Sequence, residues 1–203
     1  MEFLTTLDQL EALYGDASPG SLQKETPFIT DDYRRLIEAS PFVTIATAGA
    51  DGMDCSPKGD APGFVRVLDE HTLAIPDRRG NNRLDSLRNL MEDPRIGLLF
   101  LIPGVGETLR VNGTAHITAD EGLRTAMAVR GKTPNVVIVV DVESVYFHCS
   151  KAILRSELWD RDHHVERSTL PTPGQIKASL GNAEVDAATA DTMYERQQLE
   201  NLY

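Results

Sequence analysis

The chain has 203 residues, a formal net charge of −11, 41% hydrophobic residues and 25% charged residues. This acidic balance argues against binding to nucleic acids or anionic membranes, because both interactions begin with positive charge on the protein. No run approaches about 18 uninterrupted apolar residues, which argues against a transmembrane helix. The N-terminal segment carries acids instead of a basic region, which argues against a secretory signal, so we expect a cytoplasmic protein.

Two short helices are predicted in the N-terminal 40 residues. Leucines recur at helical spacing over residues 6–14, and a second helix is expected to begin at Thr30 and to end at Ser40-Pro41. Between them, Gly15–Thr26 has the composition of a connector. We expect residues 1–40 to pack as helices on the barrel described below, or on a second subunit.

Seven strands and two further helices are predicted between residues 41 and 160. The strands are expected at residues 42–48, 53–58, 64–68, 72–76, 96–102, 108–118 and 136–147, and the helices at residues 83–94 and 120–129. We therefore predict a mainly β fold with flanking helices (α+β). Closure of such a sheet into a small closed or split antiparallel barrel would remove its exposed edges.

The composition changes after Trp159. The segment Asp160–Arg167 is highly charged, a short helical pattern follows in Leu170–Leu180, and residues 184–202 form an acidic helix candidate. We predict three parts: N-terminal helices (1–40), a barrel (41–160) and a helical C-terminal tail (161–203).

A cluster of positive charge and amide groups lies between the fourth strand and the helix that follows it. Within the polar segment Asp77–Arg83, the last six residues contain three arginines, two asparagines and a glycine, with no acid among them. The N–H groups at a helix start point outward, and the helix dipole favours negative charge there. The segment therefore predicts a binding site for a small anion.

The same residues resemble a known family, the pyridoxamine 5′-phosphate oxidase-like FMN-binding split-barrel proteins. The match consists of Arg66-Val67-Leu68, the polar turn ending in Asn82-Arg83, Leu87, Asp93-Pro94, the IGLLF run from Ile96 to Phe100, and Leu109–Gly113. It covers roughly residues 30–160 and implies a split antiparallel barrel of the FMN-binding type. The helix before Pro94 is about one turn longer than in pyridoxamine 5′-phosphate oxidase itself. The lysine usual after the strand arginine is missing, and so is the oxidase's C-terminal substrate-binding pattern.

The resemblance also implies a set of cofactor contacts. Arg66 and Arg83 are expected to bind the FMN phosphate, because the planar guanidinium group suits phosphate oxygens. The other expected cofactor residues near them are Val67, Leu68, Ile75, Pro76, Asp77, Arg78 and Asn82. Arg66 has an alternative role in a surface ion pair with Asp69 or Glu70. Asn81 and Asn82 have alternative roles in a turn or helix cap, and Arg78 and Arg79 have alternatives as contacts to a substrate anion or as solvated charges.

A second polar cluster lies in the segment Asp54–Asp60. Ser56, Lys58 and Asp60 are candidates for contacts to the flavin ring or to the substrate. Cys55 is expected to be a small buried hydrophobic residue and not a nucleophile, because no nearby histidine completes an activating pair in the sequence.

A third cluster follows the last predicted strand. In the resembled family a second subunit completes the flavin site, often with C-terminal residues, and Lys151, Arg155 and Trp159 are candidates for that role, with helix packing as the alternative. The resemblance thus implies a homodimer with FMN at its interface. His148 and Cys149 face opposite sides of a strand, and His163-His164 is expected to face solvent, so we predict no metal site.

The sequence therefore predicts an FMN-binding oxidoreductase that transfers hydride to or from FMN on an unidentified small molecule. No residue stands out as a catalytic acid or base, so a flavin-binding or flavin-carrier protein without turnover is the alternative. A heme- or deazaflavin-linked relative is a third possibility. The heme case would require His148 as an axial ligand on an open face.

Overall fold

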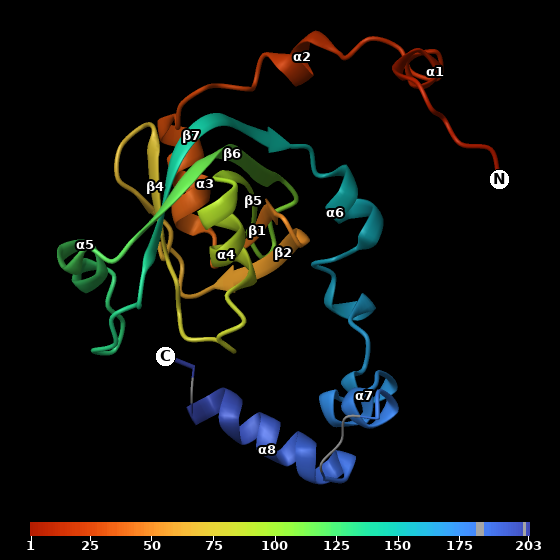
Figure 1. Cartoon of the computed structure of the whole chain (residues 1–203). Coiled ribbons are helices and arrows are strands. Elements are labelled where there is room, and N and C mark those ends of the chain that lie inside the picture. The colour runs from red at the N-terminus through yellow and green to blue at the C-terminus, as the bar shows by residue number, and fades with distance from the viewer. Residues whose placement is uncertain (182–184, 201) are drawn as a thin grey trace.

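The computed structural model describes residues 1–181, 185–200 and 202–203 (Figure 1). Its helices are α1 (Leu7–Glu11), α2 (Pro19–Leu22), α3 (Asp31–Ala39), α4 (Asp85–Glu92), α5 (Glu121–Ala126), α6 (Lys151–Ser156), α7 (Pro173–Ser179) and α8 (Ala187–Glu200), with short 3₁₀ turns at Arg161–His163 and Arg167–Thr169. Its strands are β1 (Phe42–Gly49), β2 (Gly52–Gly59), β3 (Arg66–Val67), β4 (Thr72–Pro76), β5 (Arg95–Leu101), β6 (Thr108–Thr118) and β7 (Val137–His148).

The seven strands form one antiparallel sheet in the order β2-β1-β5-β6-β7-β4-β3. The sheet curves strongly, with α3 and α4 lying against it (Figure 1). The prediction of a mainly β fold of the split-barrel type, with flanking helices, is confirmed. Among the described residues, no main-chain ladder joins the edge strands β2 and β3, so the sheet is not closed by hydrogen bonds between strands.

Two ion pairs connect the opposite ends of this sheet. The Nζ of Lys58, on edge strand β2, lies 2.6 Å from the Oδ1 of Asp77, which directly follows β4. The Nε of Arg78 lies 2.7 Å from the Oδ2 of Asp60, just after β2. All four side chains are at most 21% exposed. Side-chain charges thus bridge the place where the backbone leaves the barrel open.

The core lies on the concave side of the sheet, where strand alternation directs apolar side chains inward. Its fully buried large residues include Phe100, Ile37, Ile45, Leu73, Ile75, Leu98, Leu109 and Ile138. Helix α3 contributes Tyr33 and Ile37 to this core, whereas α1 and α2 bury none of their residues. Thr30 is confirmed as the start signal of α3, because its side chain accepts a hydrogen bond from the N–H of Tyr33.

Two elements near the polar turn are shorter than predicted. Strand β3 pairs only over Arg66–Val67, because Gly63 at a φ of +83° and a turn from Phe64 to Ala61 occupy the residues before it. Helix α4 begins at Asp85 and not at Arg83, since Asn82 and Leu84 both have left-handed φ angles, +58° and +63°.

The C-terminal tail lies outside the sheet. Helices α7 and α8 pack against each other, and α8 runs back toward the barrel, so that the chain ends beside it (Figure 1). Part of the predicted acidic helix, at residues 184 and 201, lies outside the described residues. In the portion of the chain that the structure describes, no helix is long and apolar enough to cross a bilayer.

We predict that Gly113→Ala is strongly destabilising. Gly113 sits at a register shift between β6 and β7, and an added Cβ would lie 2.0 Å from the carbonyl oxygen of Asp141. Relief of such a clash requires backbone movement, which costs about 1–3 kcal/mol. The midpoint of urea unfolding measures the loss of stability.

Gly97→Ala is the matched control, because Gly97 pairs beside this site on β5 and its added Cβ would meet nothing closer than 3.6 Å. Equal unfolding midpoints for the two variants would contradict the close approach at Gly113.

Candidate functional site

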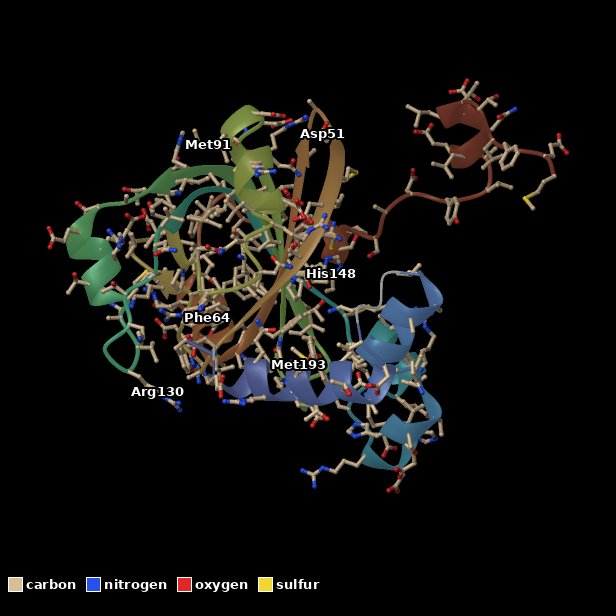
Figure 2. The ribbon with its side chains drawn as sticks, turned by 60° about the horizontal axis from the view of Figure 1, so that its bottom comes forward. Asp51, Phe64, Met91, Arg130, His148 and Met193 are labelled. Carbon is tan, nitrogen blue, oxygen red and sulfur yellow. The ribbon has the colours of Figure 1, made fainter. Side chains whose placement is uncertain are left out.

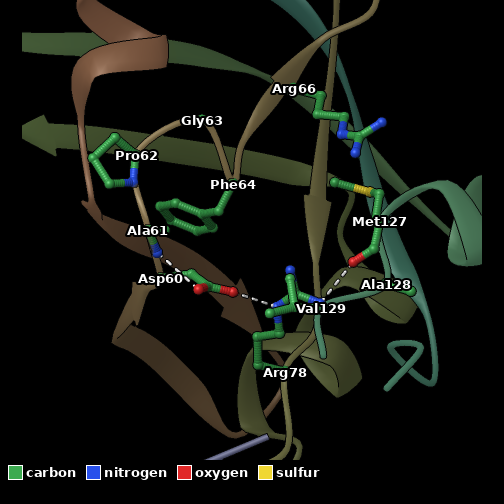
Figure 3. Close-up of a pocket in the computed structure, with 10 residues that line it drawn as sticks. All are labelled: Asp60, Ala61, Pro62, Gly63, Phe64, Arg66, Arg78, Met127, Ala128 and Val129. Carbon is green, nitrogen blue, oxygen red and sulfur yellow. Dashed lines mark hydrogen bonds and ion pairs between the residues drawn. The ribbon is translucent and has the colours of Figure 1, made fainter. Parts of the chain in front are cut away.

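A small cavity opens beside the ion pairs that join the ends of the sheet (Figure 3). It lies between the loop that follows β2 and the segment that follows α5, and its volume is about 140 Å³. Its lining residues are Asp60, Ala61, Pro62, Gly63, Phe64, Arg66, Arg78, Met127, Ala128 and Val129.

Two arginines reach the cavity and are anchored on the same piece of main chain. Arg66 donates from Nη2 to the carbonyl of Ala126, and Arg78 donates from Nη1 to the carbonyl of Met127 at 2.8 Å. Figure 3 shows the two guanidinium groups on either side of Met127. These carbonyls lie at the C-terminal end of α5, where helix carbonyls lack intrahelical partners and the helix dipole favours cations. Each anchor uses a single guanidinium nitrogen, and Arg66 itself is exposed.

Asp60 holds the second arginine in place. Its Oδ2 accepts from Nε of Arg78 at 2.7 Å, and its Oδ1 accepts from the N–H of Ala61 at 2.7 Å and from the hydroxyl of Tyr203 at 2.8 Å. Burial raises the pKa of this carboxyl, but these hydrogen bonds and the charge of Arg78 outweigh burial, so its pKa is lowered and it is ionised at neutral pH. With Arg66 and Arg78 both charged, the cavity carries one net positive charge.

The end of the polar segment that leads into α4 lies outside this cavity. Arg83 is not among the lining residues; its Nε donates to Asp85 at 2.8 Å, and its side chain is 74% exposed. Asn81 acts as a turn residue, accepting from the N–H of Arg83 at 3.0 Å. Leu84 takes the N-cap position of α4 and makes no side-chain cap bond, which leaves N–H groups of the first turn without a capping side chain.

The remaining residues expected near the cofactor are placed as follows. Ile75 and Pro76 are buried on β4, Val67 is half-buried, and Leu68 and Asn82 are exposed. None of these five lines the cavity. In the single chain, therefore, the structure brings Arg66 and Arg78 together, with Asp60, and leaves Arg83 apart from them.

The side chains of the second polar cluster are engaged within the fold. The hydroxyl of Ser56 donates to Asp54, which also accepts from Ser86 of α4 at 2.5 Å. Lys58 pairs with Asp77, as described above. Cys55 is exposed, so the expectation of a buried cysteine is wrong, because this face of edge strand β2 is not covered in the single chain.

The third cluster lies around α6. Lys151 and Arg155 are exposed, while Trp159 packs closer to the barrel and donates from its indole nitrogen to the carbonyl of Val105 at 2.7 Å. None of them lines the cavity of the same chain.

His148 is not on an open face. Its Nε2 is buried and has no hydrogen-bond partner among the described residues. Burial, followed by the nearby charges of Arg110 and Lys24, lowers its pKa and favours the neutral imidazole. The open face that the heme case expected at His148 is therefore absent at its Nε2. Within the described ranges, no group of three or more His, Cys, Asp or Glu side chains is arranged to hold a metal.

Sequence reasoning missed the Met127–Val129 segment and Tyr203. The first contributes through its main chain, which carries no signal in residue type, and the second comes from the opposite end of the chain. Arg130 and Gly131 both have positive φ and form the tight turn that the bridge between Val129 and Lys132 closes. Gly131 is the turn residue that the sequence offers at this place.

Comparison with known proteins agrees with this architecture. A family model described as pyridoxamine 5′-phosphate oxidase matches residues 29–149. The HupZ protein of Group A Streptococcus superposes with a TM-score of 0.50 and 22% identity, over 60% of this chain and 95% of its own. A comparison with curated proteins found no match.

Two further solved structures are similar. A Lactobacillus delbrueckii protein assigned to the pyridoxamine 5′-phosphate oxidases has a TM-score of 0.47 and 23% identity, over 60% of this chain and 95% of its own. An FMN-binding protein from Syntrophomonas wolfei has a TM-score of 0.42 and 13% identity, over 56% and 86% respectively. Since the family model spans more than half of the sequence and the strand order is that of a split barrel, this chain belongs to the pyridoxamine 5′-phosphate oxidase family.

Proposed function

We propose that this protein binds FMN and acts as an FMN-dependent oxidoreductase, with the phosphate of FMN held between Arg66 and Arg78. The observation that carries the proposal is the cavity in which these two guanidinium groups are anchored on adjacent carbonyls. Paired, charge-assisted hydrogen bonds from arginine are well suited to phosphate oxygens. Membership in a family that includes FMN-binding proteins supports the choice of ligand.

The size of the cavity fits one end of the cofactor. Sites for whole small molecules usually measure about 300–1,000 Å³, whereas this cavity measures about 140 Å³. It is suited to the phosphate and its nearest atoms. The flavin ring would then lie outside it, along the main chain of Ile75–Asp77.

Arg83 is proposed as a further contact to the FMN phosphate, in addition to Arg66 and Arg78. Its partner Asp85 is itself 40% exposed, and exposed pairs of this kind contribute about 0–1 kcal/mol, so Arg83 can turn toward a phosphate at low cost. The uncapped first turn of α4 offers N–H groups beside it. Asn82, which lies in the turn before α4, is proposed to contribute to cofactor binding there.

A second copy of the chain is proposed to cover the flavin ring. The convex face of the sheet carries Phe42, Leu99 and Leu101, which face away from the core, next to Cys55 and Pro57 of β2. Phe42 is exposed, and Leu99 and Leu101 are half-buried in the single chain. A partly exposed apolar surface of this kind is suited to a partner. In the dimer, Lys151, Arg155 and Trp159 of α6 and its following turn are proposed to complete the site from the other subunit.

FMN, when bound, supplies the capacity to accept or donate a hydride. The chain's own contribution is to bind and orient: Arg66 and Arg78 fix the phosphate, and Asp60 keeps Arg78 aimed into the cavity. Ser56 and Lys58 shape the floor beside the ring through their bonds to Asp54 and Asp77. No proton transfer by a side chain is required for hydride transfer itself. A flavin-carrier protein without turnover is the alternative.

We predict that Arg66→Ala weakens FMN binding about 10- to 100-fold, because a hydrogen bond to a charged group contributes about 1.5–3 kcal/mol. Titration of FMN, followed by quenching of flavin fluorescence, measures the change. Arg88→Ala, an exposed arginine on α4 outside the cavity, is the control and should leave the affinity unchanged.

The same FMN titration on Arg83→Ala shows which of Arg66 and Arg83 contributes more to FMN affinity. We expect a smaller loss than for Arg66→Ala, since Arg83 must first leave Asp85. If Arg66→Ala binds FMN with wild-type affinity, the proposal that the phosphate binds in the cavity is wrong, and the start of α4 remains as its site.

Oxidoreductase activity predicts that a reductant bleaches the bound flavin. The FMN-loaded protein is mixed anaerobically with NADH, NADPH or pyridoxamine phosphate, and absorbance near 450 nm is followed. Bleaching faster than that of free FMN supports an enzyme. Rates equal to those of free FMN with every reductant and substrate tested would favour the carrier.

Leu99→Asp is expected to separate the dimer and to release FMN, because it places a charge in the apolar face proposed as the interface. Analytical ultracentrifugation and FMN titration give the two readouts. Met91→Asp, on a side chain of α4 that is 76% exposed, should change neither. A wild-type protein that is monomeric with FMN tightly bound would overturn the proposed interface.

A further inference from the structure

The N-terminal helix α1 is folded but leaves its apolar side chains uncovered. Its capping box is complete, since the side chain of Thr6 accepts from the N–H of Gln9 and the side chain of Gln9 accepts from the N–H of Thr6. In both views α1 stands clear of the sheet (Figure 1, Figure 2). The large apolar residues of this segment are each 42–73% exposed: Phe3, Leu4, Leu7, Leu10, Leu13 and Tyr14.

A helix as short as α1 needs a surface to pack against. It has five residues and buries none of them in the single chain. Isolated helices shorter than about 12–15 residues are marginal in water, and most helical stability in proteins comes from packing of an apolar face. The exposed leucines of α1 therefore indicate a partner surface outside the single chain.

The charge of the N-terminal segment narrows the choice of partner. Residues 1–23 contain four acids and no lysine or arginine. Asp8 and Glu11 lie three positions apart on α1, beside a stripe of Leu7 and Leu10 with the same spacing. Amphipathic helices that bind anionic membranes carry basic residues on their polar face, so this segment is unsuited to such a membrane. The charge pattern instead fits a surface that places positive charge next to an apolar residue.

Such a surface lies on the outer face of the sheet. Leu99 of β5 pairs with Arg110 of β6, and Arg110 pairs with Tyr146 of β7, so the three side chains form one row, here called the outer row. Nη1 of Arg110 donates to the hydroxyl of Tyr146 at 2.9 Å, and Nζ of Lys24 lies 6.0 Å from the centre of the Tyr146 ring. Within the described ranges, neither Arg110 nor Lys24 pairs with a carboxylate.

The N-terminal segment leaves the barrel beside this row. Thr26 exchanges two main-chain hydrogen bonds with Val145 of β7, at 3.0 and 2.8 Å, and the hydroxyl of Tyr33 donates to the carbonyl of Lys24. These bonds hold the chain to the barrel from Lys24 onward, whereas residues 1–23 are all exposed. Contacts in a two-fold dimer are reciprocal, so two segments that leave beside the row can be exchanged between copies.

We propose that residues 1–23 form an arm that packs on the outer row of a second copy of the chain. The leucines of α1 lie on Leu99, and its acids face Arg110 and Lys24. The arm extends the proposed interface, which already includes Leu99. This inference rests on the proposed function only for the existence of the dimer, and FMN takes no part in it.

Two charge-reversed variants test whether the arm crosses between copies. Glu11→Lys and Arg110→Glu are each expected to raise the dissociation constant of the dimer at least about tenfold, because each places like charges opposite each other. An equal mixture of the two variants should regain the wild-type dissociation constant, since every arm in a mixed dimer meets an opposite charge. Analytical ultracentrifugation measures the separate variants and the mixture. A mixture that associates no more tightly than the separate variants overturns the exchange.

A variant of the leucine stripe tests the apolar contact. Leu7→Asp is expected to raise the dissociation constant of the dimer about 10- to 100-fold, as for loss of one buried leucine. Leu7 is 73% exposed in the single chain, so the barrel should stay folded, which circular dichroism checks. Leu180→Asp, on a leucine of the C-terminal tail that is 67% exposed, is the matched control and should leave the dimer unchanged.

The outcomes separate the arm from the proposed function. A wild-type protein that binds FMN as a monomer overturns the arm and leaves FMN binding in place. A wild-type dimer without affinity for FMN overturns the proposed function, and the mixing experiment still decides whether the arm is exchanged. Wild-type dissociation constants in both Leu7→Asp and Glu11→Lys overturn the arm while the dimer stands.

Discussion

Two ion pairs bridge the ends of the sheet where no strand ladder joins them. Backbone hydrogen bonds carry the sheet from β2 to β3, and at that point they stop. Lys58 with Asp77, and Asp60 with Arg78, join the ends instead. Because these charges are largely removed from water, loss of one partner would leave the other uncompensated, which is costly. The closure is therefore specific: it requires these residues in this register.

The same closure creates the candidate site. Arg78 reaches the cavity because Asp60 and the carbonyl of Met127 hold its guanidinium from two sides. Arg66 arrives from a neighbouring strand and meets the preceding carbonyl. The C-terminal end of α5 thus gathers two positive charges that would otherwise repel each other. A site arranged in this way needs little reorganisation when an anion enters.

The position of the site follows from which parts of the fold are irregular. Regular strands place side chains in alternation, but the cavity is lined by the loop after β2, the short β3 and the segment after α5. Loops of this kind, held by a rigid sheet, are where binding residues commonly lie. The two halves of the candidate site therefore come from segments about 60 residues apart, and Tyr203 adds a third from the far end of the chain.

The sequence predicted the regular elements well, because apolar periodicity and turn residues are local signals. Strand β6 has the bounds that alternation predicted, Thr108–Thr118, and α3 starts at Asp31, directly after its predicted first residue, Thr30. Helix α4 begins two residues later than the sequence predicts, at Asp85. Left-handed backbone at Asn82 and Leu84 delays its start, and residue type does not reveal this conformation for leucine.

By itself, the sequence determined a mainly β fold with flanking helices and a concentration of positive charge near Arg66 and the polar turn. Which arginines share a cavity was decided by the tertiary structure, which placed Arg78 beside Arg66 and left Arg83 in solvent. The physical reason is that this choice depends on distant partners, the carboxylate of Asp60 and the carbonyls of Ala126 and Met127. Hydrogen bonds to a main-chain carbonyl have no counterpart in residue type, so no pattern along the chain records them.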